Sequence, residues 1–564
     1  RRSSSAASDV YKRQDIQSLL IFWGVLVGFF ILTSRGLGVL GDVLRPTGLF
    51  LLEKALGPAI DFAEGKPGSA ARAWIILGTL WLFVSICFTF LGVWVGHDPY
   101  ALISLSGWGY SPSSPTLISA GTVAGLYGFI GMVIIGSSFH VLPILCGTPG
   151  GLPSERNGTL VSTPWTVGVL ILFIAAHNPT PFGIDITLVG VAVMALAYSA
   201  VLVNLLLTLA NRTQSPKEPG WLLILAFIAG PASLIASSIT NGPSLLADPW
   251  LVTKLLAVPF FLWSVAALSL YSAAIGSNSP LWSRTLSGTL LVGLIVTSSA
   301  YQSLDGGLFS GLITQVSAVP DVSDSTRMFG TFLIALSLAP MIALSANVIG
   351  TVRAGGKSPE ITNGMAILVT SSMALVILWL LNYAFRSPSI AGFNMYEPLL
   401  ETIELMTLWL FFIPMAMGIQ LHLYPSITKR SLPSPERTRI GYWMFVTATS
   451  AGLICMLISE SINVSTSQLE VEFNSTLSDR FAVVGSVIFY GAVIAIILHT
   501  VNVLRGLFHG RIQLESSMSD IRKIETFTIA ESITIRSILT AGADVDTMLV
   551  PVSDTEIPGA PTEL

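Results

Sequence analysis

The chain has 564 residues, of which 52% are hydrophobic and only 11% are charged. Its 28 Lys and Arg residues and 32 Asp and Glu residues give a formal net charge of −4. Because soluble globular proteins carry about 25% charged residues, this composition excludes a soluble enzyme, a disordered protein and a nucleic-acid-binding protein with a basic surface. It indicates an integral membrane protein whose partner is the lipid bilayer, with no nucleic acid.

The first segment, residues 1–14, is polar and differs in composition from the rest of the chain. It resembles translated sequencing-adapter sequence, so we leave it out of the fold prediction; the alternative is a genuine polar N-terminal tail. Residues 15–71 contain an apolar run near 17–34, which predicts an extra transmembrane helix followed by a cytoplasmic connector. Within that connector, residues 49–63 fit either an interfacial helix or a plain loop.

The remaining apolar runs extend to residue 504. Because a membrane-spanning helix needs about 20 mainly apolar residues, the chain is predicted to be an all-α polytopic membrane protein with about thirteen spans. The runs are continuously apolar rather than alternating, which favours helices over a β-barrel. After the first span, they lie near 73–96, 117–146, 160–177, 184–210, 220–239, 250–274, 281–300, 328–352, 361–385, 400–427, 440–459 and 481–504.

The loops on the two sides of the predicted membrane differ in positive charge. One set carries most of the Lys and Arg residues, and the opposite set holds only Lys254, Arg327, Arg386 and Arg480. Because positively charged loops stay in the cytoplasm, the first set is predicted to be cytoplasmic. The same rule places the polar tail, residues 507–564, in the cytoplasm, with the spans in the plasma membrane of a prokaryote.

Three helix ends share a pattern of an aromatic or His residue, a short polar loop, and a Ser that opens the next helix. The three pairs are His140 and Ser154, Tyr271 and Ser283, and His422 and Ser434. The copies lie four spans apart, which predicts three groups of four helices. The alternative is that helix ends look alike because Pro, Gly, Ser and Arg all suit the membrane interface.

With these helix ends, residues 72–506 resemble subunit I of the haem-copper oxidases, and the C-type branch is nearest. The stretches that carry the resemblance include Gly125–Pro143, Ala318–Asp321, Glu401–Pro425 and Arg480–Gly485. The resemblance implies a twelve-helix bundle with approximate threefold symmetry, to which this chain adds one N-terminal transmembrane helix.

The family reduces dioxygen at a haem and copper pair held by histidines, whose imidazoles suit these metals. By the resemblance, the ligand positions in this chain are occupied by Gly121, Leu255, Leu304, Asp305, Ile403 and Leu405. None of these is a histidine, so we expect no catalytic residue, no metal site, no haem and no copper. Haem and copper are expected only if this assignment of ligand positions is wrong.

The resemblance and the missing histidines together predict a degenerate paralogue of cytochrome c oxidase subunit I. We expect it to act as a structural or accessory subunit of a respiratory complex, with other oxidase subunits as partners. One alternative is an active terminal oxidase with atypical haem ligands. Another is a transporter or channel that uses the vacated cofactor cavity.

Several polar residues lie near the lost ligand positions. Lys254, Asp305, Glu401 and Glu404 are candidates for an ion network where the metals would sit. The alternative is that each lies at a helix end and reaches interfacial water. The histidines outside the ligand positions allow two further readings. His97 and His177 are weaker candidates for haem ligands, whereas His140, His422 and His499 are expected to be anchors at the membrane interface.

Overall fold

The structure, a computed structural model, describes residues 66–148, 151–241, 257–297, 309, 312, 324–386, 397–469 and 475–512. Within these ranges every regular element is a helix, apart from one isolated bridge that pairs Arg430 with Ile512. Four expected segments lie outside the described residues, namely residues 1–14, the span near 17–34, residues 49–63 and the tail beyond residue 512.

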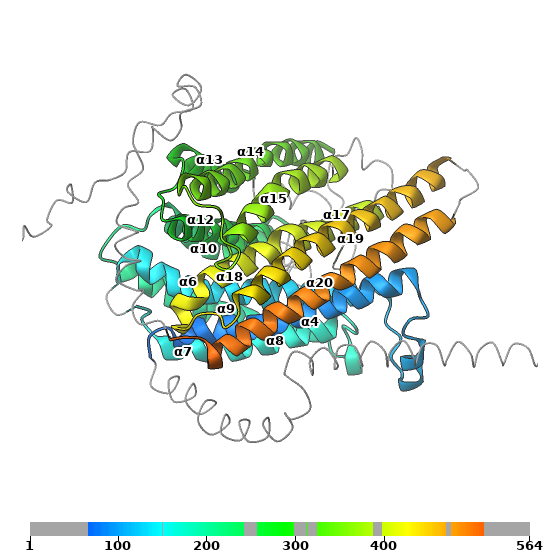
Figure 1. Ribbon diagram of the computed structural model, residues 1–564, viewed down its shortest axis with the longest axis horizontal. Coiled ribbons are helices and arrows are strands. Elements are labelled where there is room, and N and C mark those ends of the chain that lie inside the picture. Colours follow the sequence, from blue (N-terminus) through cyan, green and yellow to red (C-terminus); the bar gives the residue numbers. More distant parts are fainter. Residues whose placement is uncertain are drawn as a thin grey trace, which may run out of the picture.

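The long helices run side by side and form one bundle, in which the α19–α20 hairpin extends farther than its neighbours (Figure 1). In chain order, the helices are α4 (Ser69–His97), η2 (Ile103–Trp108), α5 (Ser114–Val123), η3 (Ala124–Ile130), α6 (Gly131–Cys146), α7 (Glu155–Leu160), α8 (Ser162–Ala175), η4 (Pro181–Gly183), α9 (Ile186–Ala210), α10 (Glu218–Asn241), η6 (Ala257–Leu262), α12 (Trp263–Ser277), α13 (Arg284–Thr297), α14 (Asp324–Ala354), α15 (Met365–Arg386), α17 (Glu397–Thr407), η9 (Leu408–Phe412), α18 (Ile413–Thr428), α19 (Pro435–Leu469) and α20 (Ser475–His509).

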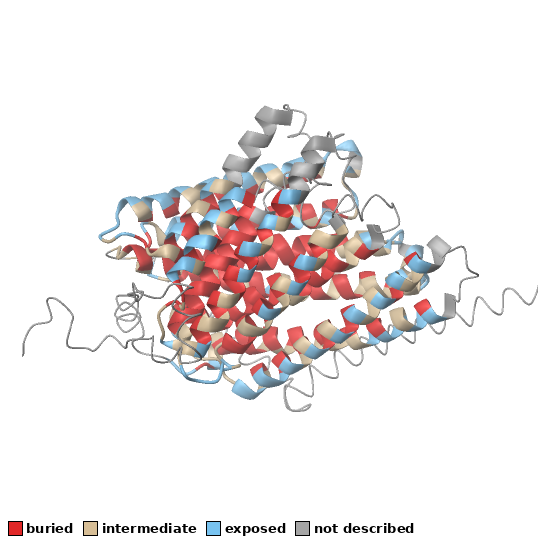
Figure 2. Ribbon diagram, turned by 90° about the horizontal axis from the view of Figure 1, so that it is seen from above, coloured by how far each residue is buried: buried red, intermediate tan, exposed pale blue. Residues whose placement is uncertain are grey.

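Ten helical segments of the described chain are long and apolar enough to cross a membrane, as the sequence predicts. Two shorter apolar helices, in α10 and α13, coincide with two further expected spans. The outer surface is itself apolar: Leu196 is 74% exposed and Val487 is 69% exposed. Figure 2 shows buried residues inside the bundle and exposed ones around it. Such an apolar outer surface fits lipid, because water would favour polar side chains there.

The two ends of the bundle differ in charge. The basic end is where α4 begins and α6, α18 and α20 end; the opposite end, where α4 ends and α5 and α17 begin, is called the cavity end below. In the described segments, the cavity end carries only Arg327, Arg386 and Arg480 as Lys or Arg. The basic end carries Lys66, Arg72, Arg156, Arg212, Lys217, Arg284, Arg353, Lys357, Lys429, Arg430, Arg437, Arg439, Arg505 and Arg511.

Three helical segments form the inside of the bundle. In each of the windows within Ser114–Cys146, Pro259–Ser277 and Leu399–Thr428, 89% of the residues are buried, against 28–56% in the other spans. The C-terminal parts of these segments, α6, α12 and α18, all contact one another. They are therefore inner helices, surrounded by helices that face lipid on one side.

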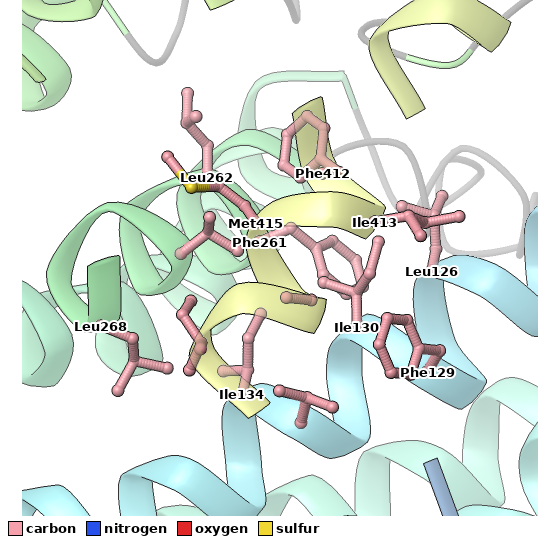
Figure 3. Close-up of a cluster of buried hydrophobic side chains, with 14 of the residues drawn as sticks. Leu126, Phe129, Ile130, Ile134, Phe261, Leu262, Leu268, Phe412, Ile413 and Met415 are labelled. Atoms are coloured by element: carbon pink, nitrogen blue, oxygen red, sulfur yellow. The ribbon is translucent and has the colours of Figure 1, made fainter. Parts of the chain in front are cut away.

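Apolar side chains fill the space between the three inner segments (Figure 3). The rings of Tyr127 and Phe261 lie 5.4 Å apart, and those of Phe309 and Phe412 also lie 5.4 Å apart, both edge to face. All the labelled side chains are buried: Leu126, Phe129, Ile130, Ile134, Phe261, Leu262, Leu268, Phe412, Ile413 and Met415. The bundle therefore has a packed apolar centre.

Each inner segment also contains a π-helical turn, η3, η6 or η9. A π-helical turn disturbs the regular hydrogen bonding of an α-helix, so its polar groups need other partners. In η3, the indole Nε1 of Trp165 donates a hydrogen bond of 2.9 Å to the carbonyl oxygen of Tyr127. Helix α8 thus supports the π-helical turn from the side.

The inner segments end alike. The residue after each helix has a left-handed backbone, with φ of 59° at Gly147, 53° at Asn278 and 57° at Lys429. A serine then caps the next helix by accepting a hydrogen bond from a backbone amide. The three serines and the residues whose amides they accept from are Ser154 with Asn157 at 3.2 Å, Ser283 with Leu286 at 3.3 Å, and Ser434 with Arg437 at 3.3 Å.

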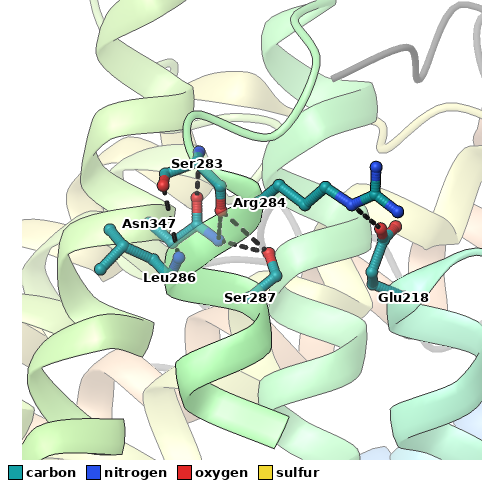
Figure 4. Close-up of polar contacts among 6 residues, drawn as sticks. All are labelled: Glu218, Ser283, Arg284, Leu286, Ser287 and Asn347. Carbon is teal, nitrogen blue, oxygen red and sulfur yellow. Dashed lines mark hydrogen bonds and ion pairs between the residues drawn. The ribbon is translucent and has the colours of Figure 1, made fainter. Parts of the chain in front are cut away.

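A buried asparagine from a later helix binds the carbonyl oxygen of each capping serine. The Nδ2 donors are Asn204 to Ser154 at 3.0 Å, Asn347 to Ser283 at 3.3 Å, and Asn502 to Ser434 at 3.0 Å. Figure 4 shows the second copy, where Asn347 Nδ2 also donates to Ser287 Oγ at 2.8 Å. In each copy the asparagine lies 50 to 68 residues from the serine that it binds. A similar composition of helix ends does not explain a hydrogen bond over that distance. The recurrence of this Asn–Ser bond therefore favours a true repeat.

Candidate functional site

Three of the positions that the resemblance assigns to haem or copper ligands are described by the structure, and all three are closely packed. A Cβ atom on Gly121 would lie 2.5 Å from Thr89 Oγ1 and 2.8 Å from Thr89 N, because α5 packs closely on α4. Ser85 Oγ donates to the Gly121 carbonyl oxygen at 2.7 Å, which holds the two helices together. An imidazole at this position would need the helices to separate. The side chains of Ile403 and Leu405, 0% and 5% exposed, offer no lone pair to a metal.

The other assigned ligand positions, Leu255, Leu304 and Asp305, lie outside the described residues, and so does Lys254. The ion network that joins Lys254 and Asp305 to the glutamates therefore stays a prediction. The two glutamates differ in solvent exposure. Glu404 is 0% exposed and does not reach interfacial water, whereas Glu401 is partly exposed and lines a cavity.

That cavity has a volume of about 310 Å³ and lies at the cavity end of the bundle. Its wall is built by α4, α5, α17, α19 and α20. The polar groups that line it include His97, Ser114, Glu401, Glu460 and Asp479. Two of its apolar lining residues, Leu312 and Leu405, also belong to the main hydrophobic core.

Hydrogen bonds between helices hold the wall of the cavity in place. Ser459 Oγ donates to the Ser478 carbonyl oxygen at 2.9 Å and lies 2.8 Å from Ser478 Oγ, which joins α19 to α20. Ser114 Oγ donates to the Gly92 carbonyl oxygen at 2.7 Å, which joins α5 to α4. These contacts link separate helices of the cavity wall.

Carboxylates give the cavity its chemical character. Glu401, Glu460 and Asp479 come from three helices, and Asn463 Nδ2 donates to Glu460 Oε2 at 3.4 Å. Among the described residues, no group of three or more His, Cys, Asp or Glu side chains has an arrangement that could hold a metal ion. Three carboxylates that line one partly enclosed cavity favour a cationic group there.

Sequence reasoning found part of this site. It singled out three residues that line the cavity, each for a different reason: His97 as a possible haem ligand, Glu401 as part of an ion network, and Leu405 at a lost ligand position. It missed Asp479. The signal available was the position of Asp479 beside Arg480, at the start of the span that follows Glu460.

His177 and His499 lie outside the cavity and contact other side chains of the bundle. His177 packs against the rings of Phe88, Phe173 and Tyr110, and its Nδ1 lies 3.0 Å from the Phe173 carbonyl oxygen. The prediction that His499 is an interface anchor is wrong, because this side chain is only 6% exposed.

A buried polar network contains His499. Its Nε2 forms a hydrogen bond of 3.0 Å with Gln420 Oε1, and Gln420 Nε2 donates to Thr79 Oγ1 at 2.7 Å. At a rise of about 1.5 Å per residue, His499 lies about 15 Å along α20 from the basic end. The network joins α4, α18 and α20 within the bundle, where hydrogen bonding replaces the water that these groups lose.

Comparison of the chain with protein-family models and with curated proteins finds no match.

Proposed function

We propose that the chain is a haem-copper-oxidase subunit-I-like membrane protein without metal centres, acting as a structural or accessory subunit of a respiratory complex. The observation that carries the proposal is the packed apolar centre. Phe261, Phe412 and Ile130 are each at most 1% exposed there, and such side chains can neither ligate a metal nor leave room for a macrocycle.

The oxidase-like layout rests on the repeated features of the bundle. Each inner segment has a π-helical turn, a left-handed end and a following serine cap, and each cap is bound by a buried asparagine. This recurrence supports three groups of four helices, as a twelve-helix bundle with approximate threefold symmetry requires. By the positive-inside rule, the basic end lies in the cytoplasm of a prokaryote.

The alternatives have less support. An active oxidase with atypical ligands needs a cofactor near the inner helices, where the centre is filled. A channel or transporter through that centre needs a polar or water-filled path, and the buried side chains of Phe261, Phe412 and Ile413 pack there.

The test uses the full chain, purified in mild detergent from membranes of its native source. We expect no stoichiometric haem in the reduced-minus-oxidised spectrum, no stoichiometric iron or copper by metal analysis, and a constant molar ratio to a haem-bearing oxidase subunit. Stoichiometric haem would refute the loss of the metal centre. Purification free of any oxidase subunit, in a detergent that keeps known oxidases intact, would refute the accessory role.

A further inference from the structure

We propose that the cavity at the cavity end binds a small organic cation with an apolar body. This inference goes beyond the accessory role and does not rest on it. Its first support is the cavity itself, since about 310 Å³ of open volume falls within the size range of small-molecule sites. In the three inner segments, by contrast, 89% of the residues in each window are buried. An opening of ligand size in such a bundle points to an occupant.

The lining of the cavity gives the chemical class of that occupant. Glu401, Glu460 and Asp479 contribute carboxylates, whereas His97 is the only basic side chain among the described lining residues. The carboxylates lie in a partly enclosed cavity, where attraction to a cation is stronger than in bulk water. They favour an ammonium or guanidinium group and disfavour an anion.

The opposite wall suits an apolar group. Ile118, Leu405 and Met456 come from α5, α17 and α19 and line the same cavity. A flexible thioether such as that of Met456 adapts to apolar groups of varied shape. A cation that carries a hydrocarbon or aromatic body can thus contact carboxylates and apolar side chains at once.

The cavity lies near enough to the aqueous boundary to be reached. At about 1.5 Å per residue, Glu460 lies about 37 Å along α19 from its start at the basic end. The hydrocarbon core of a bilayer is only about 30 Å thick. The carboxylates therefore lie at the level of the headgroups, where a soluble cation enters without crossing the hydrocarbon.

The test compares three probes of similar size and different charge, 2-phenylethylamine, 2-phenylethanol and phenylacetate. Binding is measured by isothermal titration calorimetry on the full chain in nanodiscs of neutral lipid. We expect saturable binding of the amine, on the order of tenfold tighter than that of the alcohol, because a hydrogen bond to a charged group contributes at least this much. Phenylacetate should not bind measurably.

Variants locate the binding. Glu401→Gln and Glu460→Gln keep the shape of the side chain and remove its charge, and each should weaken amine binding on the order of tenfold. Glu436→Gln is the matched control, because Glu436 is exposed on the same helix as Glu460 but at the basic end. It should bind the amine like the unaltered chain.

Ala482→Phe tests the cavity without changing charge, since Ala482 lines it and a larger side chain would occupy it. We expect loss of amine binding. Equal affinity for the amine and the alcohol, absence of saturable amine binding, or unchanged binding in both Gln variants would overturn the proposal. The comparison of the three probes uses the unaltered chain, so it tests the proposal even if a substitution prevents folding. None of these results depends on haem content.

Discussion

The asparagines that bind the capping serines make different numbers of hydrogen bonds, which allows a quantitative prediction. Asn204 Nδ2 donates only to the Ser154 carbonyl oxygen. Asn502 Nδ2 donates to the Ser434 carbonyl oxygen at 3.0 Å and to Thr438 Oγ1 at 2.9 Å. Replacing each asparagine with alanine should therefore destabilise the bundle by different amounts.

Asn347 makes the most contacts of the three. Its Nδ2 donates to the Ser283 carbonyl oxygen and to Ser287 Oγ, and its Oδ1 accepts from the Ser283 amide at 3.1 Å. Hydrogen bonds between membrane helices contribute about 0.6 kcal/mol each on average, up to about 1.7. We expect losses of about 2–4 kcal/mol for Asn347→Ala, about 1–3 for Asn502→Ala and about 0.5–1.5 for Asn204→Ala.

The assay is the free energy of unfolding in mixed micelles, measured by denaturant titration with tryptophan fluorescence. Asn211→Ala serves as the control, because Asn211 is exposed at the end of α9 and should change stability by less than about 0.5 kcal/mol. Equal effects at all three sites, or a larger effect for Asn204→Ala than for Asn347→Ala, would refute the reasoning from hydrogen-bond number.

Three further predictions follow from the packing. Gly121→His should reduce the yield of monodisperse protein on size-exclusion chromatography without producing a haem spectrum, because its Cβ would meet Thr89 at 2.5 Å; well-folded protein with bound haem would contradict the assignment. Phe261→Ala should lower the free energy of unfolding by about 3–5 kcal/mol, since Phe261 is 0% exposed; a loss below about 1 kcal/mol would mean that the centre is loosely packed. Glu155→Ala should speed amide exchange at Gly68 and Ala70, because the two Glu155 oxygens each accept a 3.0 Å hydrogen bond from those amides; unchanged exchange would argue against this cap.

The candidate site was only partly predictable because its members come from distant parts of the chain. His97 lies about 300 residues before Glu401, Glu401 lies 59 residues before Glu460, and nothing local links them. Glu404 and His499 illustrate the same difficulty. Each has the sequence surroundings of an interfacial residue, yet the packing of neighbouring helices buries both.

The sequence by itself determined that the chain is a helical membrane protein and where most of its helices lie. A span is a local property, since a run of about 20 apolar residues must satisfy its own backbone hydrogen bonds in lipid. The recurring helix ends could also be predicted from the sequence, because Ser and Pro affect where a helix begins or ends within a few residues of their position.

The tertiary structure alone decided which helix faces meet. In lipid, helix packing depends on close contact and on hydrogen bonds between helices rather than on burial from water. The partner of Ser283 is thus Asn347, 64 residues away, and the partner of His499 is Gln420. For the same reason, the filled centre and the open cavity could not be read from apolar runs, which look alike in both places.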